Sequence, residues 1–379
     1  MTAATERMRL DAEAGPAEPA RAARLDETAL AFLRRNPAEA PVLLLWALRG
    51  RTELARRLRD RVPAGSVTPA STVEPTSGAS RWRLIAKAAR LHQWSKNALV
   101  AVPLVLGGRA SDLDGWIAVI AGMLLLGLLA SSTYVLNDLW DLEDDRKHWT
   151  KRNRPFASGR LPIGAGLVAA LVGIVLALAG ALALGLSVFA GFLAYLAITL
   201  AYSFRVKRIM VLDAFALASL FTMRLVIGIA IAQVPGSPWL LVFSMFLFAS
   251  LSLAKRHTEI LRVVESGRDR AAGRGYLASD GPVLIALGVA SGVSAVLVMV
   301  LYLIEEAFRA GYYATPAMLW VFPCALFVFI GRIWIYSGRG ELNDDPVVFA
   351  IKDKASLCLG AAMAAAFVVA VWPARFLPW

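Results

Sequence analysis

The sequence predicts an all-α protein that crosses a membrane about nine times, and three observations support this fold class. Of the 379 residues, 58% are hydrophobic and only 18% are charged, whereas soluble domains are typically about 45–50% apolar and about 25% charged. The apolar residues gather in runs of about 20 residues, the length that a helix needs to cross hydrocarbon. The basic residues gather between these runs. A soluble enzyme, a disordered chain and a disulfide-rich secreted protein are therefore excluded.

Nine apolar runs are candidate membrane spans. The first is the weakest, because it is short, contains Pro103 and needs part of the preceding polar segment to complete a crossing. The candidate spans centre on residues 98–108, 115–136, 162–184, 187–204, 211–233, 237–254, 282–303, 314–336 and 355–372.

The distribution of Lys and Arg predicts the orientation. With nine spans and a cytoplasmic N-terminus, only Arg109, Arg309 and Arg375 fall on the outer side, and the cytoplasmic segments hold nearly all the other cations of residues 81–379. Positive charge marks the cytoplasmic side of membrane proteins. The net charge of +12 then needs no nucleic-acid partner. We expect a multi-pass protein of a bacterial-type inner (plasma) membrane, in contact with the lipid bilayer.

The chain divides into residues 1–80 and residues 81–379. The first part lacks a secretory signal pattern and ends in a linker rich in Pro, Ser, Thr and Gly. It predicts an amphipathic helical pair at the cytoplasmic membrane surface. It also resembles part of the haloacid-dehalogenase-like phosphatase domain that precedes some membrane transferases, but the Asp-x-Asp signature of that phosphatase is missing, so we expect no phosphatase activity.

An acidic motif follows the second candidate span. Asp138, Asp141 and Asp145 share one narrow face of a helix at the observed spacing, and Asn137 flanks that face. Aligned carboxylates repel one another unless a cation lies among them, and an oxygen-only set suits Mg²⁺, which shares its shell with substrate phosphates. The motif therefore predicts a site for a Mg²⁺-bound diphosphate. The alternative is a solvated acidic helix end that the cations of residues 146–152 neutralise.

A basic loop, Lys151–Pro155, follows directly. Arg152 and Arg154 are suited to bind the non-bridging oxygens of a leaving diphosphate, because each guanidinium can donate to two oxygens at once. The alternative reading is a set of positive charges that anchors the cytoplasmic side.

The acidic motif and the Arg-x-Arg-Pro sequence of residues 152–155, in a chain of nine candidate spans, resemble the UbiA superfamily of intramembrane prenyltransferases. That resemblance covers residues 81–379 and implies an all-helical fold, a cytoplasm-facing cavity and Mg²⁺. Typical members carry a second Asp-rich motif after the sixth span. This chain instead has Lys255, Arg256, Glu259 and Arg262 there, and a basic segment is suited to bind a phosphate directly rather than through a metal. The alternative is that these cations only mark the cytoplasmic end of the span.

The basic segment, together with the sequence His-Gln-Trp-Ser-Lys-Asn at residues 92–97, resembles the decaprenyl-phosphate phosphoribosyltransferase branch of that superfamily. The resemblance implies that phosphoribosyl diphosphate (PRPP) is the donor, that a polyprenyl phosphate is the acceptor and that the product enters cell wall biosynthesis. It places Lys96 and Asn97 among the substrate-binding residues, and Lys255 and Arg256 on the acceptor.

Three further residues are candidates for substrate binding. Arg224 lies inside the fifth span, where a charge costs about 2.5–3.5 kcal/mol on insertion scales and needs a cavity and a partner. A structural pair with an Asp is the alternative. Tyr202 and Lys207 end the fourth span and are suited to line the same cavity, with an aromatic belt and a topology anchor as alternatives.

The predicted reaction is Mg²⁺-dependent transfer of 5-phosphoribosyl from PRPP to the polyprenyl phosphate at the cytoplasmic membrane face. Two alternatives stay open: a UbiA-type prenyltransferase that uses a prenyl diphosphate and an aromatic or lipid acceptor, and a non-enzymatic protein that binds or transports polyprenyl phosphate. The sequence is compatible with a monomer and with a homo-oligomer.

Overall fold

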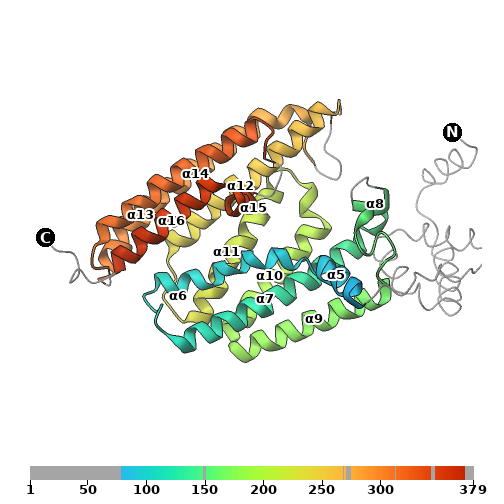
Figure 1. The fold of residues 1–379 in the computed structure, drawn as a ribbon, viewed down its shortest axis with the longest axis horizontal. Helices are drawn as coiled ribbons and strands as arrows, with labels where there is room; N and C mark the ends of the chain where they lie inside the picture. The colour runs from blue at the N-terminus through green and yellow to red at the C-terminus, as the bar shows by residue number, and fades with distance from the viewer. Residues whose placement is uncertain are drawn as a thin grey trace, which may run out of the picture. The chain divides into compact units, whose positions relative to one another are not determined.

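The computed structural model describes residues 78–147, 151–267, 269, 275–311, 313–342 and 346–371. Within these ranges the regular structure is almost entirely helical (Figure 1), so the predicted all-α class is confirmed. Residues 1–77 lie outside the described residues. The amphipathic pair and the phosphatase-like remnant predicted there therefore stay predictions.

Eight helices among the described residues are long and apolar enough to cross a membrane. Their lengths and composition make the chain a multi-pass membrane protein. These helices are α7 (Leu113–Trp140), α9 (Ile163–Leu184), α10 (Leu186–Phe204), α11 (Leu212–Ala232), α12 (Pro238–Glu265), α13 (Gly281–Glu305), α14 (Val321–Gly338) and α16 (Lys354–Val371). The shorter elements are α5 (Gly78–Ala88), η2 (Leu91–Ala101), α6 (Val102–Leu106), α8 (Leu142–Lys147), η3 (Lys151–Asn153), η4 (Val206–Arg208), η5 (Ala278–Asp280), η6 (Ala307–Arg309), η7 (Pro316–Trp320) and α15 (Pro346–Lys352).

The predicted first span, residues 98–108, is not a membrane-length α-helix. Its residues divide between the 3₁₀ helix η2 and the five-residue helix α6, which has Pro103 in its first turn. Proline is accommodated there because the first turn of a helix has no intrahelical partner for its N–H groups. The count of nine spans is therefore not confirmed, and the described residues contain eight.

The chain forms two compact units. The first comprises the described residues up to Leu91 together with Tyr134–Gly173. Its apolar core joins α5, the end of α7, α8 and the loop after η3 through Ala88, Leu139, Leu142 and Phe156. Because Leu139 and Leu142 alternate with the acidic residues of the motif, burial of this apolar side fixes the direction in which the carboxylates point.

The second unit comprises His92–Thr133 and Ile174–Trp379. Helices α12, α13, α14 and α16 lie side by side in it (Figure 1). Its core includes Ala218, Phe248, Leu284 and Ile333. Small residues let membrane helices approach closely, and the packing of α13 on α14 depends on one of them.

That residue is Gly288, on α13. A Cβ atom at this position would lie 1.9 Å from Cζ2 of Trp334. The contact is fixed by hydrogen bonds, because the Trp334 indole donates to Ser250 Oγ at 3.0 Å and Ser250 donates to the Gly288 carbonyl at 2.7 Å. The absence of a side chain at position 288 therefore sets the distance between α13 and α14.

We expect Gly288→Ala to lower the free energy of unfolding by about 1–3 kcal/mol, because overpacking forces the indole to move. The measurement is thermal unfolding of the purified protein in detergent. Gly331→Ala is the matched control, since a Cβ atom there meets nothing within 4 Å. Equal unfolding midpoints for the two variants would contradict the packing argument.

Candidate functional site

Asp138 of the acidic motif has two arginine partners. Its side chain is buried near the end of α7. Its Oδ1 accepts hydrogen bonds from Arg90 Nη2 at 2.6 Å and from Arg154 Nη1 at 3.1 Å. A buried carboxylate needs such partners because leaving water costs free energy.

Asp145 meets the same guanidinium. Its Oδ2 accepts a hydrogen bond from Arg154 Nη1 at 2.6 Å, so the carboxylates of Asp138 and Asp145 converge on one nitrogen atom. Burial raises the pKa of the Asp145 carboxyl, and the nearby Arg154 opposes that shift. The predicted convergence of acidic side chains is therefore confirmed for these two residues.

The predicted single helix through the motif is interrupted at Asp141, a turn residue between the end of α7 at Trp140 and the start of α8 at Leu142. Helical spacing nevertheless continues through the turn. The Asp141 N–H donates to the Asn137 carbonyl at 2.9 Å, and the Asp145 N–H donates to the Asp141 carbonyl at 2.8 Å. Asn137 and Asp141 are half-buried. Their predicted roles as metal ligands stay predictions.

The donor set fits Mg²⁺ in its chemistry. No group of three or more His, Cys, Asp or Glu side chains in the described part of the chain is arranged to hold a metal ion. Proteins often bind Mg²⁺ with only one or two carboxylates, and the substrate phosphates and water supply the other oxygens. Asp138 and Asp145, which converge on one point, meet that smaller requirement.

The basic residues around this pair differ from the prediction in one respect. The sequence predicts that Arg154 binds a diphosphate, whereas in the structure it bridges Asp138 and Asp145. Arg152 is exposed. Arg90, which sequence reasoning missed, also pairs with Asp138 and lies 4.8 Å from the centre of the Tyr134 ring. Arg90 belongs to a stretch of basic residues that served only to predict the orientation in the membrane, so nothing in the sequence indicated its partner.

Arg256 in the second unit is a correction to the prediction. The sequence predicts that it contacts the acceptor, but its side chain is only 2% exposed and lies between two carboxylates. Its Nε lies 2.7 Å from Asp213 Oδ2, and its Nη1 lies 2.5 Å from Glu259 Oε2. A charge buried in a helix bundle needs such partners. Neither Asp213 nor its link to Arg256 was predicted.

The neighbours of Arg256 differ in exposure. Tyr202 and Lys207 are half-buried, and the Tyr202 hydroxyl accepts a hydrogen bond from Arg256 Nη2 at 3.4 Å. Lys255 and Glu259 are half-buried, whereas Arg262 is exposed and donates to the Leu342 carbonyl at 3.3 Å. Of the two cations that the sequence predicts for the acceptor, Lys255 is thus half-buried and Arg256 is buried.

Arg224 is buried on α11, and neutral groups hold it. Its Nε donates to Asn97 Oδ1 at 3.2 Å, its Nη2 donates to the Tyr195 hydroxyl at 2.9 Å, and its Nη1 donates to the Leu220 carbonyl at 2.5 Å. No acidic partner of Arg224 is seen among the residues that the structure describes. The alternative of an Asp pair is therefore not supported.

A ring brings Arg224 and Lys96 together. The Phe221 ring centre lies 5.3 Å from Lys96 Nζ and 5.3 Å from Arg224 Cζ. The Phe221 ring stacks on Phe248 with the ring centres 4.2 Å apart. Two predicted substrate-binding cations of the second unit thus lie close to one aromatic side chain.

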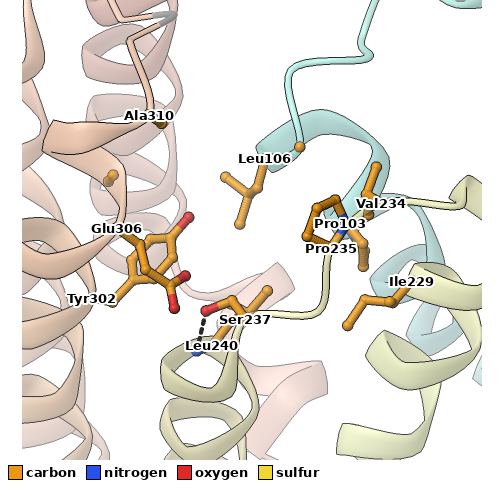
Figure 2. A pocket seen from close by; sticks show the side chains of 12 residues that line it. Pro103, Leu106, Ile229, Val234, Pro235, Ser237, Leu240, Tyr302, Glu306 and Ala310 are labelled. Atoms are coloured by element: carbon orange, nitrogen blue, oxygen red, sulfur yellow. Dashed lines mark hydrogen bonds between the residues drawn. The ribbon is translucent and has the colours of Figure 1, made fainter.

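Phe248 also lines an apolar cavity of about 300 Å³. Residues from η2, α12, α14 and α16 take part in this lining, among them Leu99, Phe322 and Phe367. A second cavity, of about 250 Å³, contains Tyr302 and Glu306 opposite Pro103 and Val234 (Figure 2). Neither cavity is lined by a described site residue that the sequence predicts, but Phe248 of the first cavity stacks on Phe221, which lies beside Lys96 and Arg224.

We expect Arg224→Lys to lower the free energy of unfolding by about 1.5–3 kcal/mol. A lysine ammonium group cannot donate hydrogen bonds to all three acceptors in the geometry of the planar guanidinium. Thermal unfolding in detergent measures this change. Arg309→Lys is the control, since Arg309 forms an exposed ion pair with Glu305, and such pairs contribute little. A similar loss in both variants would argue against the network around Arg224.

Comparison with known proteins indicates a family. The profile of the UbiA prenyltransferase family matches residues 98–351. An uncharacterized protein, y4nM, of Sinorhizobium fredii is 44% identical over 282 residues, which cover 74% of this chain and 55% of that protein. The nodulation protein NoeC of Azorhizobium caulinodans is 34% identical over 291 residues, which cover 75% of this chain and 92% of NoeC.

A third relative carries a biochemical name. The decaprenyl-phosphate phosphoribosyltransferase of Mycobacterium tuberculosis is 35% identical over 180 residues, which cover 46% of this chain and 60% of the enzyme. The chain therefore spans little more than half of both this enzyme and the S. fredii relative.

Solved structures share the fold. A digeranylgeranylglyceryl phosphate synthase aligns with a TM-score of 0.55 and 13% identity over 77% of this chain and 99% of the synthase. A UbiA homologue from Archaeoglobus fulgidus, bound to GPP and Mg²⁺, aligns with a TM-score of 0.52 and 14% identity over 76% of this chain and 98% of the homologue.

Proposed function

Because the chain belongs to the UbiA prenyltransferase family of membrane transferases, we propose that it transfers 5-phosphoribosyl from PRPP to a polyprenyl phosphate. The observation that carries this proposal is the convergence of Asp138 and Asp145 on Arg154, which joins acidic and basic groups suited to a metal-bound diphosphate. The name of the mycobacterial relative supports the choice of substrates. We place the reaction at the cytoplasmic face of an inner membrane, where the sequence predicts the basic loops.

The donor end of the proposed reaction uses the first unit. Asp138 and Asp145, with Asn137 and Asp141 as the further predicted ligands, would hold Mg²⁺, and the ion would supply positive charge that stabilises a diphosphate leaving group. Arg154 now pairs with the two carboxylates. In the proposed reaction its guanidinium binds diphosphate oxygens instead. A guanidinium binds two such oxygens in one plane, and the exposed Arg152 offers a second one.

The acceptor end uses the second unit. Lys255 and Lys207 are half-buried cations suited to a phosphate monoester. The apolar cavity beside Phe248 is suited to an isoprenoid chain, because ligand cavities of this kind are mostly apolar with a few polar groups. Lys96 and Arg224 lie within cation–π distance of the Phe221 ring, which stacks on Phe248, so positive charge lies near apolar space, as an anionic lipid requires.

The proposed chemistry is a displacement at the anomeric carbon. An oxygen of the polyprenyl phosphate forms a bond to C1 of the ribose, the bond between C1 and the diphosphate oxygen breaks, and diphosphate leaves with its electron pair. The acceptor is already anionic at neutral pH, since the second pKa of a phosphate monoester is about 6. No general base is needed, and catalysis depends on positioning and charge stabilisation.

A prenyl diphosphate is the other candidate for the group donor, and one observation favours it. A solved relative with the same fold holds GPP and Mg²⁺, so a prenyl diphosphate donor with an aromatic or lipid acceptor is the second candidate. Lys255 and Arg262 on α12 favour PRPP transfer, because direct phosphate binding by cations suits a lipid phosphate acceptor. A lipid-binding protein without turnover is the third outcome.

The test is a transfer assay on the purified protein with labelled PRPP and decaprenyl phosphate, with and without Mg²⁺. We expect Mg²⁺-dependent label in the organic phase. Absence of label, with the same preparation active on GPP and an aromatic acceptor, would replace the proposal by the second candidate. Binding of decaprenyl phosphate without turnover of either substrate pair would favour the third outcome.

We expect Asp138→Asn and Asp145→Asn each to lower kcat by about 10²–10³-fold, because each removes charge that stabilises the metal-bound leaving group. The same transfer assay, run over a range of Mg²⁺ concentrations, measures the effect. Asp114→Asn, at the other end of α7 and exposed, is the control. Full turnover by both motif variants would falsify the assigned role of the acidic pair.

A further inference from the structure

The backbone at Val211, just before α11, is strained. Val211 has φ +63° and ψ −44°, and the Leu212 N–H donates to the Met210 carbonyl at 2.6 Å. These values describe a γ-turn with positive φ, which is rare and unfavourable for any residue other than glycine. A β-branched side chain makes it still less favourable. Something outside the turn must hold it.

Tyr276 is one such group. It comes from the segment between α12 and α13, and its side chain is buried. Its hydroxyl accepts a hydrogen bond from the Val211 N–H at 2.8 Å and donates one to Asp213 Oδ1 at 2.6 Å. Burial and the bond to Asp213 raise the pKa of Tyr276, so at neutral pH the phenol keeps the proton that it donates.

Asp213 connects this contact to α12. Its side chain is fully buried, and its second carboxylate oxygen lies 2.7 Å from Arg256 Nε. One carboxylate therefore joins the tyrosine of one loop to the arginine of a helix. Arg256 also donates to Tyr202 at the end of α10, so the network contacts the chain on both sides of the turn.

Gly275 provides a further contact. A Cβ atom at position 275 would lie 2.7 Å from the Arg208 carbonyl oxygen, so only glycine lets the two loops approach this closely. The segment between α10 and α11 is therefore fixed at Arg208 by backbone contact and at Val211 by the Tyr276 hydroxyl.

The segment held in this way is basic. Arg205, Lys207 and Arg208 fall within four residues, in and before η4. Strained backbone persists only where the surroundings enforce it, and it is often found where a function depends on the geometry. Here the strain is located directly after the three cations and determines how the chain turns from them into α11.

The geometry points to Tyr276 and Asp213 as positioning residues that hold the basic segment Arg205–Arg208 for an anionic substrate. That the anion is the polyprenyl phosphate rests on the proposed function. Arg256 acts in the same way, through Asp213 and Tyr202, and not by contact with the substrate.

The first experiment follows the segment without using enzymatic turnover. Trypsin cleavage after Lys207 and Arg208 is timed in the detergent-purified full chain. We expect Tyr276→Phe to increase this rate about tenfold, because loss of the hydroxyl releases the turn and local opening exposes the cleavage site. Tyr336→Phe, which removes a hydroxyl bonded to Arg332 in the same unit, is the control. An unchanged cleavage rate in Tyr276→Phe overturns the inference.

The second experiment uses the transfer assay. We expect Tyr276→Phe to raise KM for decaprenyl phosphate about fivefold or more with kcat little changed, which is the signature of lost binding. Adding Val211→Gly to Tyr276→Phe should return KM most of the way to the wild-type value, because glycine adopts positive φ without strain. A merely structural role predicts lower thermal stability without this rescue. Faster cleavage with unchanged KM also overturns the positioning role.

These two readouts separate the inference from the proposed function. If the wild-type protein transfers no phosphoribosyl group, the proposed function fails, but the cleavage rates still decide whether Tyr276 holds the segment. If transfer occurs and neither readout changes in Tyr276→Phe, the proposed function stands and this inference fails.

Discussion

The free-energy cost of keeping charge away from water governs the polar interior of this protein. Several buried charged side chains in the described part of the chain lie against specific partners. Asp213 and Arg256 neutralise one another, and Asp138 lies between Arg90 and Arg154. The positions of these partners also determine which charged groups remain accessible to a ligand, so charge burial connects the fold to the candidate site.

Arg224 is a buried charge whose hydrogen-bond partners are uncharged. Its hydrogen-bond partners are an amide, a hydroxyl and a backbone carbonyl, none of which carries a charge. Hydrogen bonds to neutral groups stabilise a guanidinium but leave its charge in place. The Phe221 ring lies within cation–π distance of both Arg224 and Lys96 and adds attraction. Two cationic side chains therefore lie beside a ring that stacks on Phe248, a residue that lines an apolar cavity.

Sequence reasoning succeeded where the signal is local. Runs of apolar residues predicted eight of the membrane helices, because hydrocarbon demands a fixed length of continuous apolar helix. Helical spacing predicted that Asp138 and Asp145 share a face, and the backbone hydrogen bonds keep that spacing through the break at Asp141. It failed for residues 98–108, where a 3₁₀ helix and a proline interrupt the run.

Short stretches of sequence were therefore enough to predict the class of fold, eight membrane helices and the acidic motif, because each depends on residues close together in the chain. The partners of the charges depend on how distant segments pack. Arg256 resembles its basic neighbours in sequence, yet Asp213 on another helix makes it a structural ion pair. Tyr276 belongs to no motif, and only packing brings its hydroxyl to the strained turn at Val211. Such contacts join distant segments, and local patterns carry no information about them.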